Sequence, residues 1–388
     1  MRSATCVLAA CLLTAGCAGT DRDVQPFRTP SLSGTGLEYY WEAPIPTDAD
    51  ETVRRLWRLD EMVYCLTDRR RLIAMDARTG LVRWSYRIEQ APEPIFRPYH
   101  PAEPVSLPIR SPGKREVRTF DAVMINTLSR LVILDRADGS EIRDLTLTFT
   151  ASTGGAADGE NFYAGAVSGR YHAFDYDVGV DTWVLSTGAI IQAPPELHAR
   201  NLYVASEDDK LYATRRGLRP KKVWIATLGA SVVAPFHVDN DGCYVAAEDG
   251  KIHAFDTFSG EPLWEPFACN ARLTSPIQAG PRALFQHAEN NVLFAVDART
   301  GRLLWKAPGG LRVLANMDGK VYVLDVDRKL RVYSEELGEL QASVPVTGLD
   351  VFLANTTAPA IYAATAGGKL FCIRPEGTDP LTPKTLAE

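Results

Sequence analysis

Short runs of strand-forming residues recur along the chain and are separated by tight polar turns. Residues 243–247 (CYVAA) and 251–255 (KIHAF) are two such runs, and the sequence Glu248-Asp249-Gly250 joins them. Two strand-like runs around a short glycine-containing turn predict a β-hairpin. Because similar pairs of runs recur from end to end, the sequence predicts an all-β protein.

The runs belong to a repeat with fixed positions for three residue types. Residues 73–84 (IAMDARTGLVRW) and 294–305 (FAVDARTGRLLW) match in register, and residues 172–183 and 253–264 keep the same key positions. In each copy a glycine follows the aspartate by four residues and a tryptophan follows the glycine by four. These residues are Asp76, Asp175, Asp256 and Asp297, with Trp84, Trp183, Trp264 and Trp305.

Weaker copies of the repeat fill the gaps between the strong ones, and Trp224 belongs to one of them. The turn glycines stand at positions 80, 139, 179, 217, 260, 301, 338 and 377. Most intervals are near 40 residues, a period that indicates a propeller, and the first is about 19 residues longer. The sequence therefore predicts an eight-bladed β-propeller of four-stranded antiparallel blades.

Each key residue of the repeat has a predicted structural role. The aspartate can accept hydrogen bonds from backbone amides of the turn, and the glycine can adopt positive φ. The tryptophan has the size to fill the wedge between two blades. An alanine stands two residues before the aspartate, which suggests a place of close approach. Repeats two and seven depart from the pattern because Arg143 and Ala342 occupy the tryptophan position.

The two ends of the chain together supply what the eighth repeat lacks. No further strand-like run follows Gly377, but residues 36–44 (GLEYYWEAP) resemble residues 301–308 (GRLLWKAP) with one extra residue before the tryptophan. An unpaired last blade would leave an open sheet edge. We therefore expect residues 37–43 to pair with the last repeat and Trp41 to be its missing tryptophan.

Four segments lie outside the regular repeat. Residues 1–17 have the charge and short apolar core of a signal peptide. Their end, Leu-Thr-Ala-Gly-Cys, resembles a bacterial lipobox with Cys17 as the lipidated residue, and cleavage nearby by an ordinary signal peptidase is the alternative. We interpret residues 18–35 as a flexible tether, 36–377 as one propeller and 378–388 as a disordered tail.

A proline-rich insertion of residues 89–117 separates repeats one and two. Its prolines disfavour helix and central strand. Because it lies outside the repeat, we expect it to contribute little to stability. Both contact with a partner and a passive insertion remain open; the candidate contact residues, of types enriched at interfaces, are Phe96, Arg97, Tyr99, His100 and Arg110.

Composition excludes some functions and leaves others open. The net charge is −6, and loss of residues 1–17 would make it one unit more negative, which argues against nucleic acid as a partner. The histidines show no metal-ligand spacing. Outside residues 1–17 the cysteines Cys65, Cys243, Cys269 and Cys372 leave a disulfide open, but the apolar strand patterns around Cys65, Cys243 and Cys372 favour buried free thiols.

The repeat resembles that of the quinoprotein dehydrogenases and their non-catalytic relatives. That resemblance implies a quinone site with adjacent cysteines and a calcium ion, but no Cys-Cys pair and no calcium-ligand set is present. We therefore expect no cofactor.

With its lipobox and length, the chain also resembles the BamB family of outer-membrane assembly lipoproteins. This implies a monomeric, non-enzymatic scaffold facing the periplasm, with a BamA-like protein as partner, and Ala18 after the anchor fits outer-membrane sorting. Binding of another envelope protein or a glycan, and a quinoprotein-type oxidoreductase, are the alternatives.

The lipobox resemblance predicts acylation of Cys17. Radiolabelled palmitate should enter the wild-type protein and should be absent from the Cys17→Ser variant, because the thiol is the acceptor of the diacyl group. Label that persists in the variant would place the anchor elsewhere.

Overall fold

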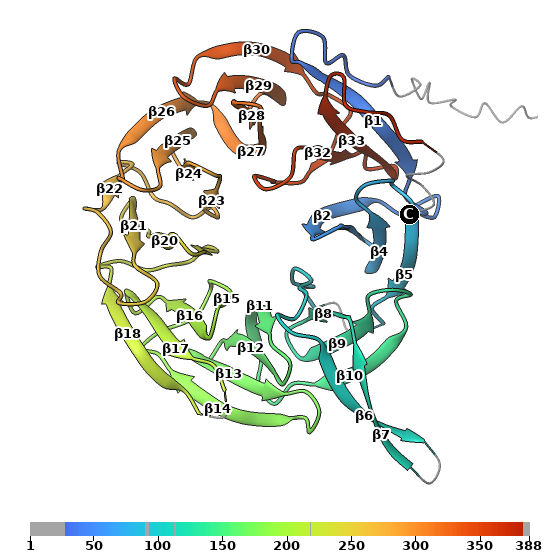
Figure 1. The fold of residues 1–388 in the computed structure, drawn as a ribbon, viewed down its shortest axis with the longest axis vertical. Helices are drawn as coiled ribbons and strands as arrows, with labels where there is room; N and C mark the ends of the chain where they lie inside the picture. The colour runs from blue at the N-terminus through green and yellow to red at the C-terminus, as the bar shows by residue number, and fades with distance from the viewer. Residues whose placement is uncertain (1–27, 90–92, 112–113, 218, 383–388) are drawn as a thin grey trace, which may run out of the picture.

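The computed structural model describes residues 28–89, 93–111, 114–217 and 219–382. Within these ranges the regular elements are all β-strands, arranged as a ring of eight blades (Figure 1). The predicted fold class is confirmed. Residues 1–17, with Cys17, lie outside the described part of the chain.

Successive blades follow one another around the ring, and each runs from an inner to an outer strand. Blade one consists of β2 (Val53–Leu59), β3 (Met62–Thr67), β4 (Arg71–Asp76) and β5 (Val82–Arg87). Blade two has three described strands, β8 (Ala122–Asn126), β9 (Arg130–Asp135) and β10 (Glu141–Thr146). Blade three consists of β11 (Ala151–Ala157), β12 (Asn161–Ala166), β13 (Arg170–Asp175) and β14 (Val180–Ser186). Blade four consists of β15 (Glu196–His198), β16 (Asn201–Ser206), β17 (Lys210–Arg215) and β18 (Lys221–Thr227).

The second half of the ring repeats this plan. Blade five consists of β19 (His237–Val238), β20 (Cys243–Ala246), β21 (Lys251–Phe255) and β22 (Phe267–Ala268). Blade six consists of β23 (Gln278–Ala279), β24 (Ala283–Ala288), β25 (Val292–Asp297) and β26 (Leu303–Pro308). Blade seven consists of β27 (Gly310–Met317), β28 (Lys320–Asp325), β29 (Lys329–Ser334) and β30 (Leu340–Pro345). Blade eight consists of β31 (Val351–Phe352), β32 (Ile361–Ala364), β33 (Lys369–Pro375) and β1 (Leu37–Pro44).

The position of a strand in its blade explains its hydrophobic pattern. Strands β3 and β12 lie second from the channel and are buried at every residue, since neighbouring blades cover both of their faces. The outer strand β14 is buried only at Trp183 and is exposed or half-buried at its other residues. Continuous apolar runs therefore mark the middle of a blade, and its rim is marked by a largely exposed strand with a buried tryptophan.

The turn before each outer strand has the geometry that the repeat predicts. In blade six, Asp297 Oδ1 accepts hydrogen bonds from the amides of Arg299 and Thr300 at 3.2 and 2.8 Å. Gly301 has φ of +68°, a conformation that glycine adopts without steric cost. The same aspartate and positive-φ glycine form the turns of blades one, three and five.

The repeat tryptophans connect each blade to the next. Trp84 of blade one donates its indole N–H to the carbonyl of Arg136 in blade two at 2.9 Å. Its ring covers Gly139 so closely that a Cβ there would lie 2.6 Å from it. The same indole-to-carbonyl bond to the next blade is made by Trp183, Trp224, Trp264 and Trp305.

The repeat alanines make room for these tryptophans within their own blade. Ala295 stands directly opposite Trp305 across two antiparallel strands, and Ala74 stands opposite Trp84 in the same way. Both alanines are fully buried. A larger side chain at these positions would meet the indole, so the small residue and the large one occur as a pair.

The N-terminal strand closes the ring, as the sequence predicts. Strand β1 pairs antiparallel with β33 from Leu37 opposite Pro375 to Pro44 opposite Lys369, and a bulge before Trp41 takes up a residue. Trp41 is 8% exposed and packs against Tyr362 and against Gly80 of blade one. The two ends of the chain therefore share one sheet (Figure 1).

The folded chain extends beyond the boundaries that we expected at both ends. Leu32 is 6% exposed and packs in the core shared by blades seven and eight, although we interpreted residues 18–35 as tether. Tyr39 donates its hydroxyl to the carbonyl of Pro30 at 2.9 Å. After Gly377, the carbonyl of Asp379 accepts a bond from the Tyr40 hydroxyl at 2.9 Å, although we interpreted residues 378–388 as a disordered tail.

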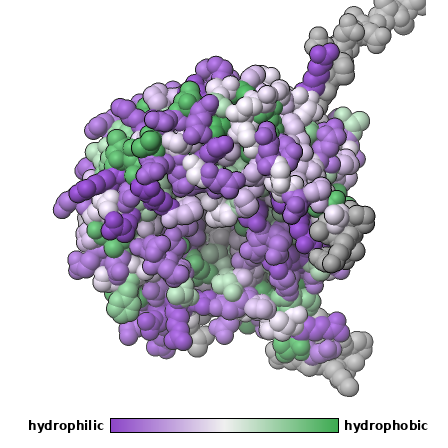
Figure 2. Space-filling model, turned by 45° about the horizontal axis from the view of Figure 1, so that its top comes forward, coloured by the Kyte–Doolittle hydropathy of each residue, from purple (hydrophilic) through white to green (hydrophobic). Residues whose placement is uncertain are grey.

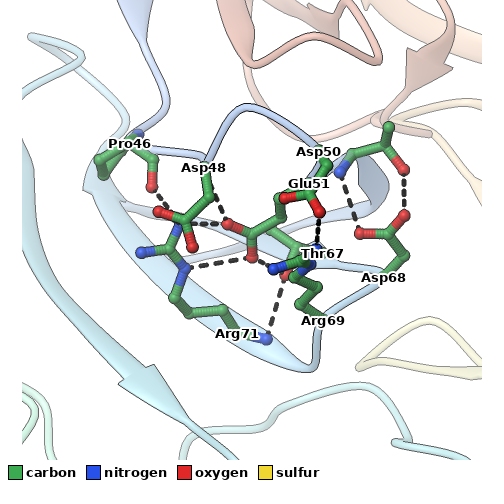
Figure 3. A network of polar contacts seen from close by, with 9 residues as sticks. Pro46, Asp48, Asp50, Glu51, Thr67, Asp68, Arg69 and Arg71 are labelled. Carbon is green, nitrogen blue, oxygen red and sulfur yellow. Dashed lines mark hydrogen bonds and ion pairs between the residues drawn. The ribbon is translucent and has the colours of Figure 1, made fainter.

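A polar network holds the connection between β1 and β2 (Figure 3). Glu51, whose side chain is fully buried, accepts hydrogen bonds from Thr67 Oγ1 at 2.5 Å and from Arg71 Nε at 3.1 Å. Arg71 also donates to the carbonyl of Pro46 at 2.5 Å. Burial alone would raise the pKa of Glu51, but its bonds with Arg71 and Thr67 lower that pKa below the usual range. The carboxylate thus ties the closing strand to blade one.

Closure by β1 predicts a large effect of its buried tryptophan. Trp41→Ala should lower the free energy of unfolding by about 3–5 kcal/mol, because a buried indole is removed from the contact between blades eight and one. Urea denaturation followed by circular dichroism measures the change. As a control, Glu42→Gln removes only an exposed pair with Lys369 and should cost less than about 1 kcal/mol. Equal, small losses for both variants would show that β1 does not close the ring.

Candidate interaction site

The insertion between blades one and two returns to the middle of the ring before it projects outward. The amide of Tyr99 donates to the carbonyl of Met124 in β8 at 3.0 Å, and the amide of Met124 donates back at 2.9 Å. Phe96 N donates to the carbonyl of Asn126 at 3.1 Å. The segment around Tyr99 therefore takes the place of the innermost strand of blade two.

The insertion also fills the wedge between blades two and three. Val105 and Leu107 are fully buried in a core with Phe162 and Phe174 of blade three. Arg143, which replaces the repeat tryptophan, donates to the carbonyl of Pro108 at 2.9 Å and holds the insertion in place. These contacts argue against our expectation that this segment contributes little to stability, since it supplies the apolar surface that the missing tryptophan would supply.

His100 links the insertion to blades one and two. Its Nε2 lies 2.8 Å from the hydroxyl of the buried Tyr64, and its Nδ1 lies 2.7 Å from Asp60 Oδ2. Arg136 of blade two also contacts Asp60, at 3.2 Å. The Arg136 guanidinium also lies 3.1 Å from Nδ1 of His100. Burial lowers the pKa of His100, so the ring is neutral at neutral pH.

A pocket of about 890 Å³ lies where these segments face the middle of the ring. Figure 2 shows the molecule hollowed at this place. Four of the five predicted contact residues line the pocket together with Ser152–Ala157 of β11 and loops of blades four, five and eight; the four are Phe96, Arg97, Tyr99 and His100.

The remainder of the insertion forms a hairpin that projects from the ring (Figures 1 and 2). Its strands β6 (Val105–Ser111) and β7 (Lys114–Phe120) pair only with each other in the sheet that they form. Val117 on β7 is 64% exposed. Arg110, the fifth predicted contact residue, pairs with Arg115 in this hairpin, and its side chain lies outside what the structure describes. Each strand thus has an edge without a strand partner.

The described residues hold no group of three or more His, Cys, Asp or Glu placed to bind a metal ion, and no helix of the length and apolarity needed to cross a membrane. The four cysteines in these residues are free and buried. Burial raises the pKa of the Cys269 thiol to about 12, so the thiol is protonated at neutral pH.

The comparison with protein families decides the family of this propeller. A family model described as outer membrane protein assembly factor BamB matches residues 36–217 and 220–387. The chain belongs to the BamB family. A comparison with curated protein sequences found no match.

Solved structures share the fold of this BamB-family propeller. The crystal structure of BamB from Moraxella catarrhalis has 17% sequence identity and a TM-score of 0.66, and the match covers 89% of this chain and 99% of that chain. The computationally designed Ika8 protein has 12% identity and a TM-score of 0.61, with 85% and 98% of the two chains covered. At these identities the likeness shows the fold alone.

Two further residues of this BamB-family chain belong to the site although the sequence did not single them out. Arg58 of β2 and Glu196 of β15 line the pocket. They come from different blades and share no motif. Neither strand carries a distinctive signal, because β2 also contains Arg54 and Arg55 and β15 has only three residues.

The buried half of the insertion predicts a stability effect. Leu107→Ala should lower the free energy of unfolding by about 2–5 kcal/mol, because it opens a cavity between blades two and three. Val117→Ala on the facing strand should stay within about 0.5 kcal/mol, since Val117 is exposed. Urea denaturation of both variants measures the difference. Equally small losses of unfolding free energy in both variants would show that the insertion does not contribute to the stability of the core.

Proposed function

We propose that this chain is a non-enzymatic scaffold of the bacterial envelope that takes part in assembly of outer-membrane β-barrel proteins. It is anchored by lipid on Cys17 at the outer membrane, faces the periplasm and binds a BamA-like barrel-assembly protein. The observation that carries the proposal is the family match, which extends over nearly the whole propeller.

The projecting hairpin supports a role in protein binding. A strand with an unpaired edge offers backbone N–H and C=O groups to a partner strand, a common mode of protein recognition. The base of the hairpin is held by the fully buried Val105 and Leu107 and by Arg143, whereas Val117 is exposed. The hairpin is therefore positioned by the core while its outer part is accessible to a partner.

The sequence supports the absence of redox catalysis. The quinoprotein dehydrogenases that the repeat resembles hold their cofactor with adjacent cysteines and a calcium ion. This chain has no adjacent cysteines, and the four described thiols are free: Cys65 lies in blade one, Cys372 in blade eight, and Cys243 and Cys269 at separate places of blade five. A scaffold needs neither group.

Affinity capture tests the proposal. The full-length lipoprotein with a C-terminal tag should be expressed in its bacterium and recovered from detergent-solubilised envelopes, and co-purifying proteins should be identified by mass spectrometry. We expect enrichment of a BamA-like barrel protein. Recovery of an unrelated complex or a polysaccharide instead would overturn the assembly role, and quinone-dependent dye reduction would overturn the non-enzymatic assignment.

A pair of matched variants tests the hairpin as the contact. Val117→Asp places a charge on the hairpin and should reduce recovery of the barrel protein at least fivefold. Phe258→Asp makes the same kind of change at a residue that is 85% exposed in blade five, and recovery should be unchanged. Melting curves of both variants should match the wild type, because neither side chain is buried. Equal recovery with both variants would exclude the hairpin.

A further inference from the structure

We propose that the pocket at the middle of the ring binds a small carboxylate with an apolar body, and that Arg97 and Arg58 hold its charged end. This inference does not depend on the assembly role, because it rests on side chains of the pocket alone.

The walls of the pocket are mostly apolar. Four prolines line it, together with Phe96, Leu59 and Leu197; the prolines are Pro98, Pro194, Pro195 and Pro235. Proline has no backbone N–H, so these walls offer carbonyl oxygens and hydrocarbon surface but few donors. The apolar part of a ligand can lie against them, while a charged group depends on the few ionisable side chains present. The volume of about 890 Å³ is in the range of small-molecule sites.

Two guanidinium groups of the pocket lie near carboxylates without a direct ion pair in the described part of the chain: Arg97 near Glu196 and Arg58 near Asp60. Neither Arg58 nor Arg97 forms an ion pair within 4.0 Å among these residues, and Nε of Arg58 is buried without a hydrogen-bond acceptor. Asp60 also lines the pocket but is engaged by His100 and Arg136. A buried donor without an acceptor is uncommon in folded proteins. The planar fork of arginine matches a carboxylate in two parallel bonds, which favours that anion.

Glu196 makes the charge of the pocket depend on pH. Burial raises the pKa of Glu196 to about 7, although the nearby charge of Arg97 opposes the shift. The other group that faces it is the Cys243 thiol of β20, whose pKa burial raises well above the usual value. Across the pocket, burial lowers the pKa of His100, and its bond to His100 lowers that of Asp60. Between about pH 7 and 8, Glu196 is therefore the pocket group that titrates.

Binding of a carboxylate should be coupled to protonation of Glu196. The negative charge of the ligand disfavours the ionised form of Glu196, so the pKa of Glu196 rises further when the ligand binds. The complex then takes up a proton, and affinity increases as the pH falls from the raised pKa of the complex towards about 7 and levels off below that. With one proton taken up, affinity changes by up to about tenfold per pH unit.

Calorimetric titration of the propeller tests the site with defined probes. Octanoate and N-acetyl-leucine supply a carboxylate on an alkyl and on a peptide-like body, their amides remove the charge, and inorganic phosphate supplies a different anion. We expect at least one carboxylate to bind, with affinity about five- to tenfold higher at pH 6 than at pH 8, and the amides and phosphate to bind at least tenfold more weakly. Which carboxylate binds tells whether the body is alkyl or peptide-like.

Two variants assign the binding to the named residues. Arg97→Met should weaken carboxylate binding at least tenfold, whereas Arg302→Met, an exposed arginine outside the pocket, should leave it unchanged. Glu196→Gln should still bind but lose most of the pH dependence. Thermal melting checks that each variant is folded. Failure of both carboxylates to bind, equal binding of the amides or phosphate, or wild-type affinity in Arg97→Met would overturn the proposal.

Discussion

The fold depends on one contact that recurs around the ring, in which a tryptophan of one blade covers the turn glycine of the next. A Cβ at Gly139 would lie 2.6 Å from the ring of Trp84, and one at Gly301 would lie 2.5 Å from the ring of Trp264. The glycine is required twice, because its φ is also positive. The indole N–H bonds to the same turn, so each contact combines apolar burial with a satisfied donor.

A closed ring must make this contact once between its last and first blades, and here the two ends of the chain cooperate. Trp41 comes from the N-terminal strand and covers Gly80 of blade one. Its indole N–H has no partner among the described residues, and the corresponding carbonyl, that of Ala77, accepts the hydroxyl of Tyr362 at 2.9 Å. The contact between Trp41 and Gly80 thus keeps the packing of the repeat, while the Tyr362 hydroxyl instead of the indole N–H donates to the Ala77 carbonyl. The Glu51 network then fixes the chain as it leaves the closing strand.

The two blades without a repeat tryptophan show how other segments fill the wedge. At blade two, Arg143 replaces the tryptophan and holds the insertion, whose Val105 and Leu107 occupy the space. At blade seven, Ala342 stands in that position, and Leu32 and Leu37 from the N-terminal segment pack in the core shared with blade eight. The insertion projects as a hairpin while its base is part of the core. A departure from the repeat therefore coincides with the candidate site.

The sequence by itself determined the fold class, the number of blades and the closure by residues 37–43. The reason is that the aspartate and glycine form a turn and the tryptophan forms a packing contact in each repeat of roughly 40 residues, so the pattern is visible in the sequence. It also singled out Phe96, Arg97, Tyr99 and His100 by residue type. Only the tertiary structure decided that these residues share a pocket with Arg58 and Glu196, and that half of the insertion is core. Those outcomes depend on contacts between residues that are far apart in the chain. The closure of the ring brings these residues together, and the spacing of residues within one repeat does not predict which of them will meet.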